Sequence, residues 1–274
     1  MKRVACIILN RNLPEVTDRL YKHLAKFDGD LTDIYVVEAG SDANKLSQHA
    51  TWHADNPEVM QDGFRYGRGM NFGLVQLLKV GKFDQYDAFF LLTNDTEFKA
   101  VPTLAPLLDL LDKHPSVGIL SPCSERWGER LLLKDETTKY FWFIHNNAYL
   151  LRREFIESIC DKEHPDLMSF LFDGSNFRGY GSEHELIAKA YANDWAAAIT
   201  SQVWASENES HLFDNSDQIK TEGYEENLKL YISEGRRWMR KKYGFNSHWS
   251  MQQYVKGFYD KFFEFHPEYS RFRV

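Results

Sequence analysis

Short apolar runs alternate with longer amphipathic segments through the first hundred residues. Apolar runs of four to eight residues predict buried strands, and the amphipathic segments between them predict helices. We expect strands at Val4–Leu9, Ile34–Val37 and Ala88–Leu92, and helices at Pro14–Phe27 and from near Gly69 through Phe72–Leu78. Because the strands are almost continuously apolar, both faces of the sheet should be covered by helices. The alternation therefore predicts βαβ units and an α/β fold with a mixed, mainly parallel sheet.

The same alternation continues to about residue 205 and then changes. Helices are expected at Leu104–Leu111, Arg152–Cys160 and Glu183–Asn193, strands at Val117–Leu120, Phe141–Leu150 and Ala196–Val203, irregular structure over 124–140, and a loop at Gly174–Gly181. A charged helix is expected at Tyr224–Tyr243, ended by Gly244, with an aromatic-rich segment after it. We therefore predict a catalytic-type domain over residues 1–205 and a helical C-terminal extension over 206–274 that packs on it.

Composition and charge narrow the class of protein. The chain has 274 residues, of which 43% are hydrophobic and 15% aromatic, so it can bury a large core. Its net charge of -7 argues against nonspecific binding to nucleic acid, and we expect no nucleic-acid partner. Cys6, Cys123 and Cys160 are far apart and lack zinc-site spacing, which is typical of a reducing, cytoplasmic setting. No apolar stretch is long enough to span a bilayer.

The segment Leu91–Phe98 carries the first candidate chemistry. Its apolar run ends at Asn94 and Asp95, which places a carboxylate at the carboxyl edge of a sheet, where open α/β sheets bind ligands. An acid there can hold a divalent cation, and a cation can neutralise a diphosphate. An ordinary strand-end turn explains the same residues equally well, because Asn-Asp pairs favour turns.

Two acids open the helix predicted after residue 182. The positive end of the helix dipole stabilises Glu183 and Glu185 as anions, which suits a metal ligand or a general base. Ser182, followed three residues later by Glu185, is also a capping-box pattern. If that box forms, Glu185 is occupied and Glu183 is left to do chemistry.

Other polar positions have a structural and a functional interpretation. Glu38 and Asp42 follow the second strand, where an acid could bind a base or ribose or simply form a turn. The glycines of Gly67–Gly73 would allow close approach of a phosphate to a helix start, although the spacing matches no nucleotide-binding motif. His211 could bind manganese, but a lone histidine is more often a surface residue.

The C-terminal extension leaves its own alternatives open. The cations of Arg236–Lys242 complement a helix C-terminus, and they could also contact an anionic membrane surface or a lipid-linked acceptor. The aromatic segment Trp249–Phe272 could form a dimer contact, a membrane contact or part of the core.

These segments occur in the order found in the large inverting glycosyltransferase family of the GT-A fold, the family 2-like enzymes. Val4–Asn12 resembles the opening strand and nucleotide loop of the family, Val36–Asp42 its second strand, and Tyr66–Gly73 its glycine/asparagine helix start. Leu91–Glu97 resembles its DXD-type metal segment, Tyr180–Leu186 the acidic element that carries the base, and Trp238–Gly244 a late helix end.

The resemblance implies an enzyme that transfers a sugar from a nucleotide-diphosphate sugar to a hydroxyl of a glycan or lipid-linked acceptor. Residues 1–100 would bind the donor and 101–205 the acceptor, the latter near Trp142 and Asn146. The implied base is Glu183, with Glu185 as the fallback, and Asp95 and His211 would hold Mn²⁺ or Mg²⁺. The implied contacts to the nucleotide-sugar are Asn10, Asn12, Glu38, Arg68, Asn71 and Asn94. Bacterial surface-polysaccharide synthesis, a cytoplasmic location with peripheral contact at the inner face of the membrane, and a homodimer fit the same resemblance.

Two departures from the family pattern motivate a rival hypothesis. Thr93 stands where the metal segment usually has an acid or asparagine, and Ser182 replaces one of two adjacent acids in the base element. A catalytically inactive nucleotide-sugar-binding or scaffold protein of the same fold is therefore the alternative. A sugar-nucleotide pyrophosphorylase is less well supported, because the sequence lacks an early glycine-rich loop carrying Arg and Lys.

Overall fold

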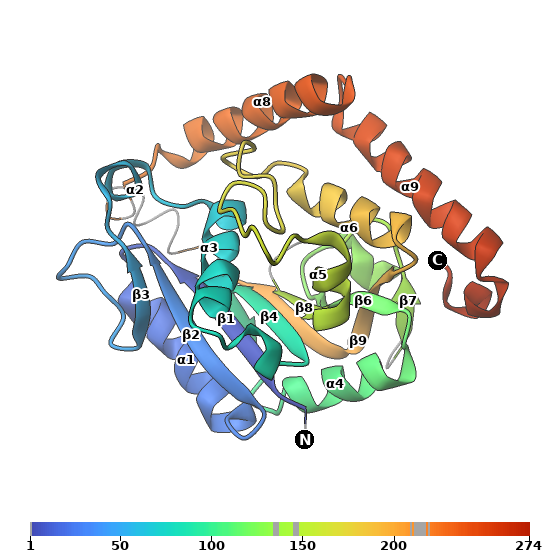
Figure 1. Cartoon of the computed structure of the whole chain (residues 1–274), viewed down its shortest axis with the longest axis horizontal. Helices are drawn as coiled ribbons and strands as arrows, with labels where there is room; N and C mark the ends of the chain where they lie inside the picture. Colours follow the sequence, from blue (N-terminus) through green and yellow to red (C-terminus); the bar gives the residue numbers. More distant parts are fainter. Residues whose placement is uncertain (1, 134–136, 145–147, 209, 211–217, 219) are drawn as a thin grey trace.

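The computed structural model describes residues 2–133, 137–144, 148–208, 210, 218 and 220–274. Within these residues one nine-stranded sheet crosses the molecule, with helices on both of its faces (Figure 1). The strands are β1 (Val4–Asn10), β2 (Thr32–Ala39), β3 (Ala50–Ala54), β4 (Ala88–Thr93), β5 (Thr96–Phe98), β6 (Val117–Ser124), β7 (Thr138–Tyr140), β8 (Ala148–Arg152) and β9 (Ala196–Glu207). The helices are α1 (Pro14–Asp28), α2 (Pro57–Asp62), α3 (Tyr66–Lys79), α4 (Leu104–Lys113), α5 (Arg153–Ile159), α6 (Ser182–Ala192), α8 (Tyr224–Tyr243) and α9 (His248–Phe265).

The order of the strands creates a place for a ligand beside β1. The sheet runs β3-β2-β1-β4-β8-β6-β9-β5, and β7 pairs with β9. Strands β1 to β4 are parallel where they pair, whereas β8 lies antiparallel between β4 and β6. From β1 the chain first builds outward through β2 and β3 and then returns to the other side of β1 with β4. The carboxyl ends of β1 and β4 therefore form a topological switch point, where ligands bind in open α/β sheets.

Two glycines let α3 lie close on β1. A Cβ atom at Gly69 would stand 2.3 Å from Leu9 Cδ1, and one at Gly73 would stand 2.8 Å from Ile7 Cγ2. Both separations are inside van der Waals contact, so a larger residue at either position would force the helix or the contacted side chain to shift. The glycine-rich segment is thus required for helix-strand packing, and this packing accounts for its composition without a phosphate.

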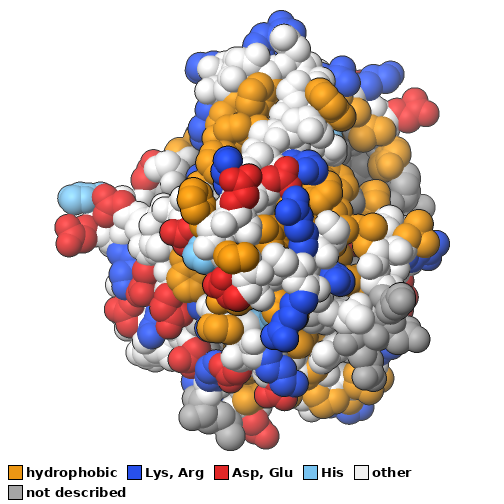
Figure 2. Space-filling view, turned by 90° about the vertical axis from the view of Figure 1, so that its right-hand side faces the viewer, with side chains coloured by type: hydrophobic (Ala, Val, Ile, Leu, Met, Phe, Trp, Pro, Cys, Tyr) orange, Lys and Arg blue, Asp and Glu red, His pale blue; other side chains and the backbone are white. Residues whose placement is uncertain are grey.

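The C-terminal helices pack along one side of the molecule (Figure 1). Helix α8 ends where Gly244 adopts a φ of 75°, a conformation that favours glycine. Helix α9 lies against α6 and buries one face, which comprises Met251, Val255, Tyr259, Phe262 and Phe263. Much of the aromatic segment is therefore core, although Trp249 and Phe265 are exposed. On the face seen from this side, acidic, basic and apolar side chains are interspersed (Figure 2).

The predicted α/β architecture is confirmed, with local differences. Among the described residues of the run predicted as one strand at Phe141–Leu150, only those from Ala148 on are strand, because β7 ends at Tyr140 and the chain bends at Trp142. Strand β3 was not predicted, since its residues are half-exposed and form no apolar run. Among the described helices, none is long and apolar enough to cross a membrane.

Candidate active site

A cleft of about 390 Å³ opens at the carboxyl ends of β1, β2 and β4. A volume of this size is in the range of small-molecule sites. One wall consists of strand-end residues, including Asn10, Ala39 and the run Thr93–Asp95. The other wall comes from the loop before α6, from Thr221, and from the first turns of α8. The cleft therefore lies between the sheet edge and the C-terminal part of the chain.

Asp95 lies in the two-residue turn between β4 and β5 and lines the cleft. The turn and the candidate ligand position are thus the same feature, so neither of the two interpretations excludes the other. Beside it, Asn94 Nδ2 donates to Asn10 Oδ1 at 3.2 Å and to Thr17 Oγ1 at 3.3 Å. These bonds fix the amide, and they leave its carbonyl oxygen as the ligand-type atom of that side chain. Asn10 and Asn94 both line the cleft, and their contact with a nucleotide-sugar stays a prediction.

The side chains of Glu38 and Asn12 are buried and do not line the cleft. Glu38 is fully buried, and its carboxylate accepts hydrogen bonds from Asn10 Nδ2 at 2.9 Å, from Ser47 N at 2.8 Å and from Ser41 Oγ. Asn12 is buried too, and it exchanges hydrogen bonds with Asp42. Neither side chain lines the cleft, and both support the loops at the ends of β1 and β2. Their predicted contact with the nucleotide-sugar stays a prediction.

Arg68 and Asn71 also face away from the cleft. Asn71 is buried, and its amide makes four hydrogen bonds to the backbone of Leu167, Leu171 and Phe172. Arg68 Nε donates to the carbonyl of Gly174 at 2.8 Å. Both side chains fasten the segment 167–174 onto α3. Neither residue lines the cleft, and their predicted contact with the nucleotide-sugar stays a prediction.

Three arginines that the sequence analysis did not single out line the cleft: Arg11, Arg65 and Arg178. Arg11 follows β1, Arg65 precedes α3, and Arg178 lies in the loop before α6, so no local motif contains all three. Arg11 Nη2 donates to the carbonyl of Gln61 at 2.8 Å, and Arg178 Nε donates to Asn227 Oδ1 at 3.3 Å. Sequence periodicity alone could not have found this group, because only the fold brings its members together.

Glu183 lies on the first turn of α6, as predicted, next to the cleft but not among its lining residues. Its side chain is mostly buried, with 14% of its surface exposed. Two tyrosines that do line the cleft, Tyr66 and Tyr231, sense its charge: burial raises the pKa of each hydroxyl, and the charge of Glu183 raises it further. Both tyrosine hydroxyls therefore lie within electrostatic range of the Glu183 carboxylate.

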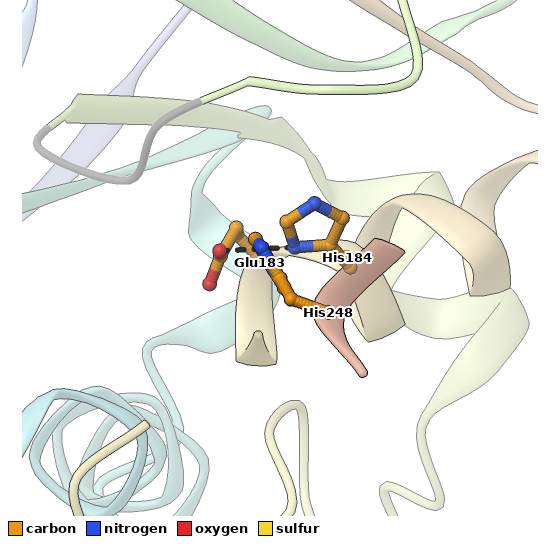
Figure 3. A group of neighbouring side chains, drawn as sticks. All are labelled: Glu183, His184 and His248. Atoms are coloured by element: carbon orange, nitrogen blue, oxygen red, sulfur yellow. Dashed lines mark ion pairs between the residues drawn. The ribbon is translucent and has the colours of Figure 1, made fainter. Parts of the chain in front are cut away.

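Two histidines surround the Glu183 carboxylate (Figure 3). His184 Nδ1 lies 3.0 Å from Glu183 Oε1, and His248 approaches from the first turn of α9. Burial opposes ionisation and raises the pKa of Glu183, but the imidazoles and hydrogen bonds outweigh it, so the pKa falls below its ordinary value. The carboxylate is thus ionised at neutral pH, as a general base must be. Ligand-type atoms of the three residues lie within 4.8 Å of one another, a spacing that would also suit a cation.

Glu185 is occupied, but not by the predicted capping box. The N-cap residue of α6 is Gly181, which has no side chain, and Ser182 is already helical. The Glu185 carboxylate instead binds Lys242 Nζ at 2.6 Å and accepts a hydrogen bond from the hydroxyl of Tyr243. Both partners come from the end of α8, so Glu185 ties α6 to the C-terminal helices. This network favours Glu183 over Glu185 as the residue available for chemistry.

Two positions from the sequence analysis fall outside the described residues. They are His211, the second predicted metal ligand, and Asn146, the predicted acceptor contact. Trp142, the other predicted acceptor contact, is half-buried against Tyr259, with Lys256 Nζ 5.5 Å from its ring centroid, and it does not line the cleft.

The described donor atoms fit a hard divalent cation at the strand ends. Asp95 offers carboxylate oxygens, Asn94 an amide oxygen and Thr93 a hydroxyl, and Mn²⁺ and Mg²⁺ prefer oxygen ligands of these kinds. Asp95 is the one acid among the cleft-lining residues of the described chain, whereas three arginines line the same space. A cation held there would therefore share the cleft with three fixed positive charges.

Comparison with known proteins identifies the architecture. Over 98% of this chain, GalNAc-T7 in a complex with UDP, GalNAc and Mn²⁺ is similar with a TM-score of 0.57 and 11% identity. A Pyrobaculum calidifontis mannosyltransferase in complex with GDP-Man and Mn²⁺ is similar over 86% of the chain, with a TM-score of 0.54 and 13% identity. The S. aureus TarS fragment with UDP-GlcNAc is similar over 96%, with a TM-score of 0.53 and 16% identity. The protein has the GT-A fold.

The GT-A architecture agrees with the one implied by the sequence resemblance. The chain spans 58% of GalNAc-T7, 64% of the mannosyltransferase and 73% of the TarS fragment. No family model and no curated protein matches the sequence. The GT-A assignment consequently comes from the arrangement of strands and helices, and the function has to be argued from the cleft.

Proposed function

We propose that the protein is a metal-dependent, inverting glycosyltransferase that uses a nucleotide-diphosphate sugar. The observation that carries the proposal is the position of Asp95: it lines a cleft at the switch point of a GT-A sheet, with a buried carboxylate, Glu183, close by. Solved proteins of the same fold hold GDP-Man, UDP-GlcNAc or UDP, and two of them hold Mn²⁺. The donor would lie along the strand ends, beside Asn10 and Asn94.

The chemistry requires a proton acceptor and stabilisation of the leaving diphosphate. Glu183 would accept the proton of the acceptor hydroxyl while that oxygen bonds to the anomeric carbon. The bond from that carbon to the diphosphate oxygen breaks, and its electron pair leaves with the nucleotide. Asp95 would hold the cation, which supplies Lewis-acid stabilisation of the diphosphate when bound. Attack from the face opposite the leaving group inverts the configuration at the anomeric carbon.

For the acceptor we propose a hydroxyl of a glycan or lipid-linked glycan, as in bacterial surface-polysaccharide assembly. The argument for it is the resemblance of the sequence segments together with the location of Glu183. Tyr66 and Tyr231 line the donor cleft and lie within electrostatic range of this acid, and sugars pack well on aromatic rings. The acceptor would accordingly enter beside these rings.

The test is a screen of nucleotide-sugars with and without Mn²⁺, in which released nucleotide and glycosylated product are both measured. Transfer that depends on the metal, with an inverted product, supports the proposal. Tight binding of a nucleotide-sugar without transfer to any of a panel of glycan acceptors favours the scaffold alternative, which Ser182 and Thr93 motivated. Failure to bind any nucleotide-sugar would refute both hypotheses.

A further inference from the structure

Three guanidinium groups converge on the cleft from separate parts of the chain. Arg11, Arg65 and Arg178 all line it, as does the strand-end acid Asp95. Burial lowers the pKa of Arg65, and the charge of Arg178 lowers it further. Burial likewise lowers the pKa of Arg11, with an added effect from Arg65. Arg65 thus senses the charge of Arg178, and Arg11 that of Arg65, although Glu234, which forms an ion pair with Arg178 Nη1, offsets part of the positive charge of this site.

A carboxylate of the protein itself occupies this positive site. Glu222, two residues before α8, forms an ion pair with Arg178, and its Oε2 lies 3.4 Å from Arg65 Nη2. The neighbouring hydroxyl of Thr221 accepts a hydrogen bond of 2.8 Å from the same Arg65 nitrogen. The Glu222 side chain is 36% exposed, whereas that of Arg178 is only 8% exposed. An accessible anion therefore neutralises cations that are fixed in the wall of the cleft.

We propose that these three arginines bind the diphosphate of the ligand, and that the Glu222 carboxylate fills this anion site until a diphosphate displaces it. The proposal rests on the donor class given above. Planar guanidinium groups bind phosphate oxygens through paired hydrogen bonds, so a diphosphate is a better partner for them than one carboxylate. With Asp95 as the acid on the strand-end wall, the arginines would supply most of the fixed positive charge that the departing diphosphate meets.

Exchange of the carboxylate does not require its segment to leave the cleft. Lys220 Nζ binds Asp42 Oδ1 at 2.5 Å, and the carbonyl of Gln218 accepts a hydrogen bond from Asn12 Nδ2. These contacts anchor the segment to the loops at the ends of β1 and β2, independently of Glu222. A rotation of the Glu222 side chain is therefore sufficient to break its contacts with Arg65 and with Arg178 Nη2, while Arg178 Nη1 stays paired with Glu234.

The experiment is a calorimetric titration of the full chain with inorganic pyrophosphate in the presence of EDTA. Wild type should bind without a divalent cation. Arg65→Gln should weaken binding roughly tenfold, the effect of one charge-assisted hydrogen-bonding group. Glu222→Gln should tighten binding about two- to fivefold, because the competing ion pairs are lost. Arg153→Gln is the control: it removes an arginine of α5 that donates to the carbonyl of Asp84, outside the cleft, and should leave binding unchanged.

The increase expected for Glu222→Gln is the decisive result, since misfolding cannot improve an affinity. No binding of pyrophosphate by wild type in EDTA, or equal affinities for wild type, Arg65→Gln and Glu222→Gln, would overturn the inference. The outcome is separable from the proposed activity. If the substitutions change pyrophosphate binding as expected but no sugar is transferred, the anion site stands and the proposed transferase activity is refuted. If sugar transfer depends on the metal but the substitutions do not change pyrophosphate binding, the transferase activity stands and the anion site is refuted.

Discussion

The two walls of the cleft are built in different ways. The strand-end wall, with Asn10, Asn94 and Asp95, is held by parallel strand pairing and by side-chain hydrogen bonds such as that from Asn94 to Asn10. The opposite wall is held by ion pairs between distant segments, such as Arg178 with Glu222 and Lys242 with Glu185. One wall is fixed by the backbone of the sheet, and the other by charged side chains that can exchange partners.

This difference suggests a division of labour. A backbone-fixed wall suits groups that must be placed accurately before the reaction, such as the ligands of a cation. A wall held by exchangeable ion pairs suits groups that must change partners when a charged ligand arrives. Glu183 belongs to the second wall in sequence, but its burial and its histidine neighbours make its position as fixed as that of Asp95. The predictions below test each wall separately.

The largest effect is expected from Glu183→Gln on the second wall. Loss of the general base should lower the transfer rate by about 10²- to 10⁴-fold, while the affinity for the nucleotide-sugar stays unchanged. Turnover and donor titration measured on the same preparation check both parts. Glu185→Gln is the matched control, because its carboxylate binds Lys242 and should affect the melting temperature rather than the chemistry. If Glu185→Gln loses turnover and Glu183→Gln does not, Glu185 and not Glu183 is the base.

On the strand-end wall, Asp95→Asn should remove the response to a divalent cation. A cation at the diphosphate contributes several kcal/mol, so the rate at saturating Mn²⁺ should fall roughly 10²-fold or more, to the level that wild type shows in EDTA. Rates measured as a function of Mn²⁺ concentration test this. Asp42→Asn, an acid near the same strand ends that does not line the cleft, should keep the wild-type response. An unaltered Mn²⁺ dependence in Asp95→Asn would rule out this aspartate as the ligand.

The strand-end wall is also the part that the sequence could predict. The end of a buried strand can be recognised from local residues alone, so the apolar run that stops at Asn94 and Asp95 predicted where these two residues lie. The helix that begins beside Glu183 was predictable for the same reason. Local patterns did not distinguish Asn71, which is a backbone clamp, from a ligand, because a buried amide and a ligand amide look alike in sequence.

The arginine cluster could not be predicted from the sequence, and the reason is physical. Arg11, Arg65 and Arg178 are separated by at least fifty residues from one another, and each stands in an unremarkable polar loop. Their partner Glu222 belongs to a segment whose position depends on the fold of all the others. Ion pairs of this kind have no periodicity, so only the three-dimensional arrangement reveals them.

A smaller effect, on stability, is expected from Asn71→Ala. Its amide makes four hydrogen bonds with the backbone of the segment 167–172, and the substitution leaves buried partners unsatisfied. The free energy of unfolding should fall by about 2–4 kcal/mol. Urea denaturation followed by circular dichroism measures the change. Asn193→Ala, which removes an exposed amide at the end of α6, should change the free energy by less than about 0.5 kcal/mol. Equal effects of the two substitutions would contradict the role of Asn71 as a clamp.

The smallest effect concerns the pH dependence of the ion-paired wall. Burial opposes ionisation of Asp173, but hydrogen bonds from Lys242, Ser175 and Trp238 outweigh it and hold the pKa of this carboxyl well below its usual range. An acid with a depressed pKa stabilises the folded protein above its unfolded-state pKa, near 4, and loses that contribution as the pH falls further. Asp173→Asn should therefore lower the free energy of unfolding by roughly 1–3 kcal/mol at pH 7, and this deficit relative to wild type should shrink below pH 4. Because other acids titrate equally in both proteins, denaturation curves of the pair isolate the contribution of Asp173. A deficit of the same size at pH 7 and at pH 3 would mean that packing, and not the charge paired with Lys242, holds the end of α8 against this wall.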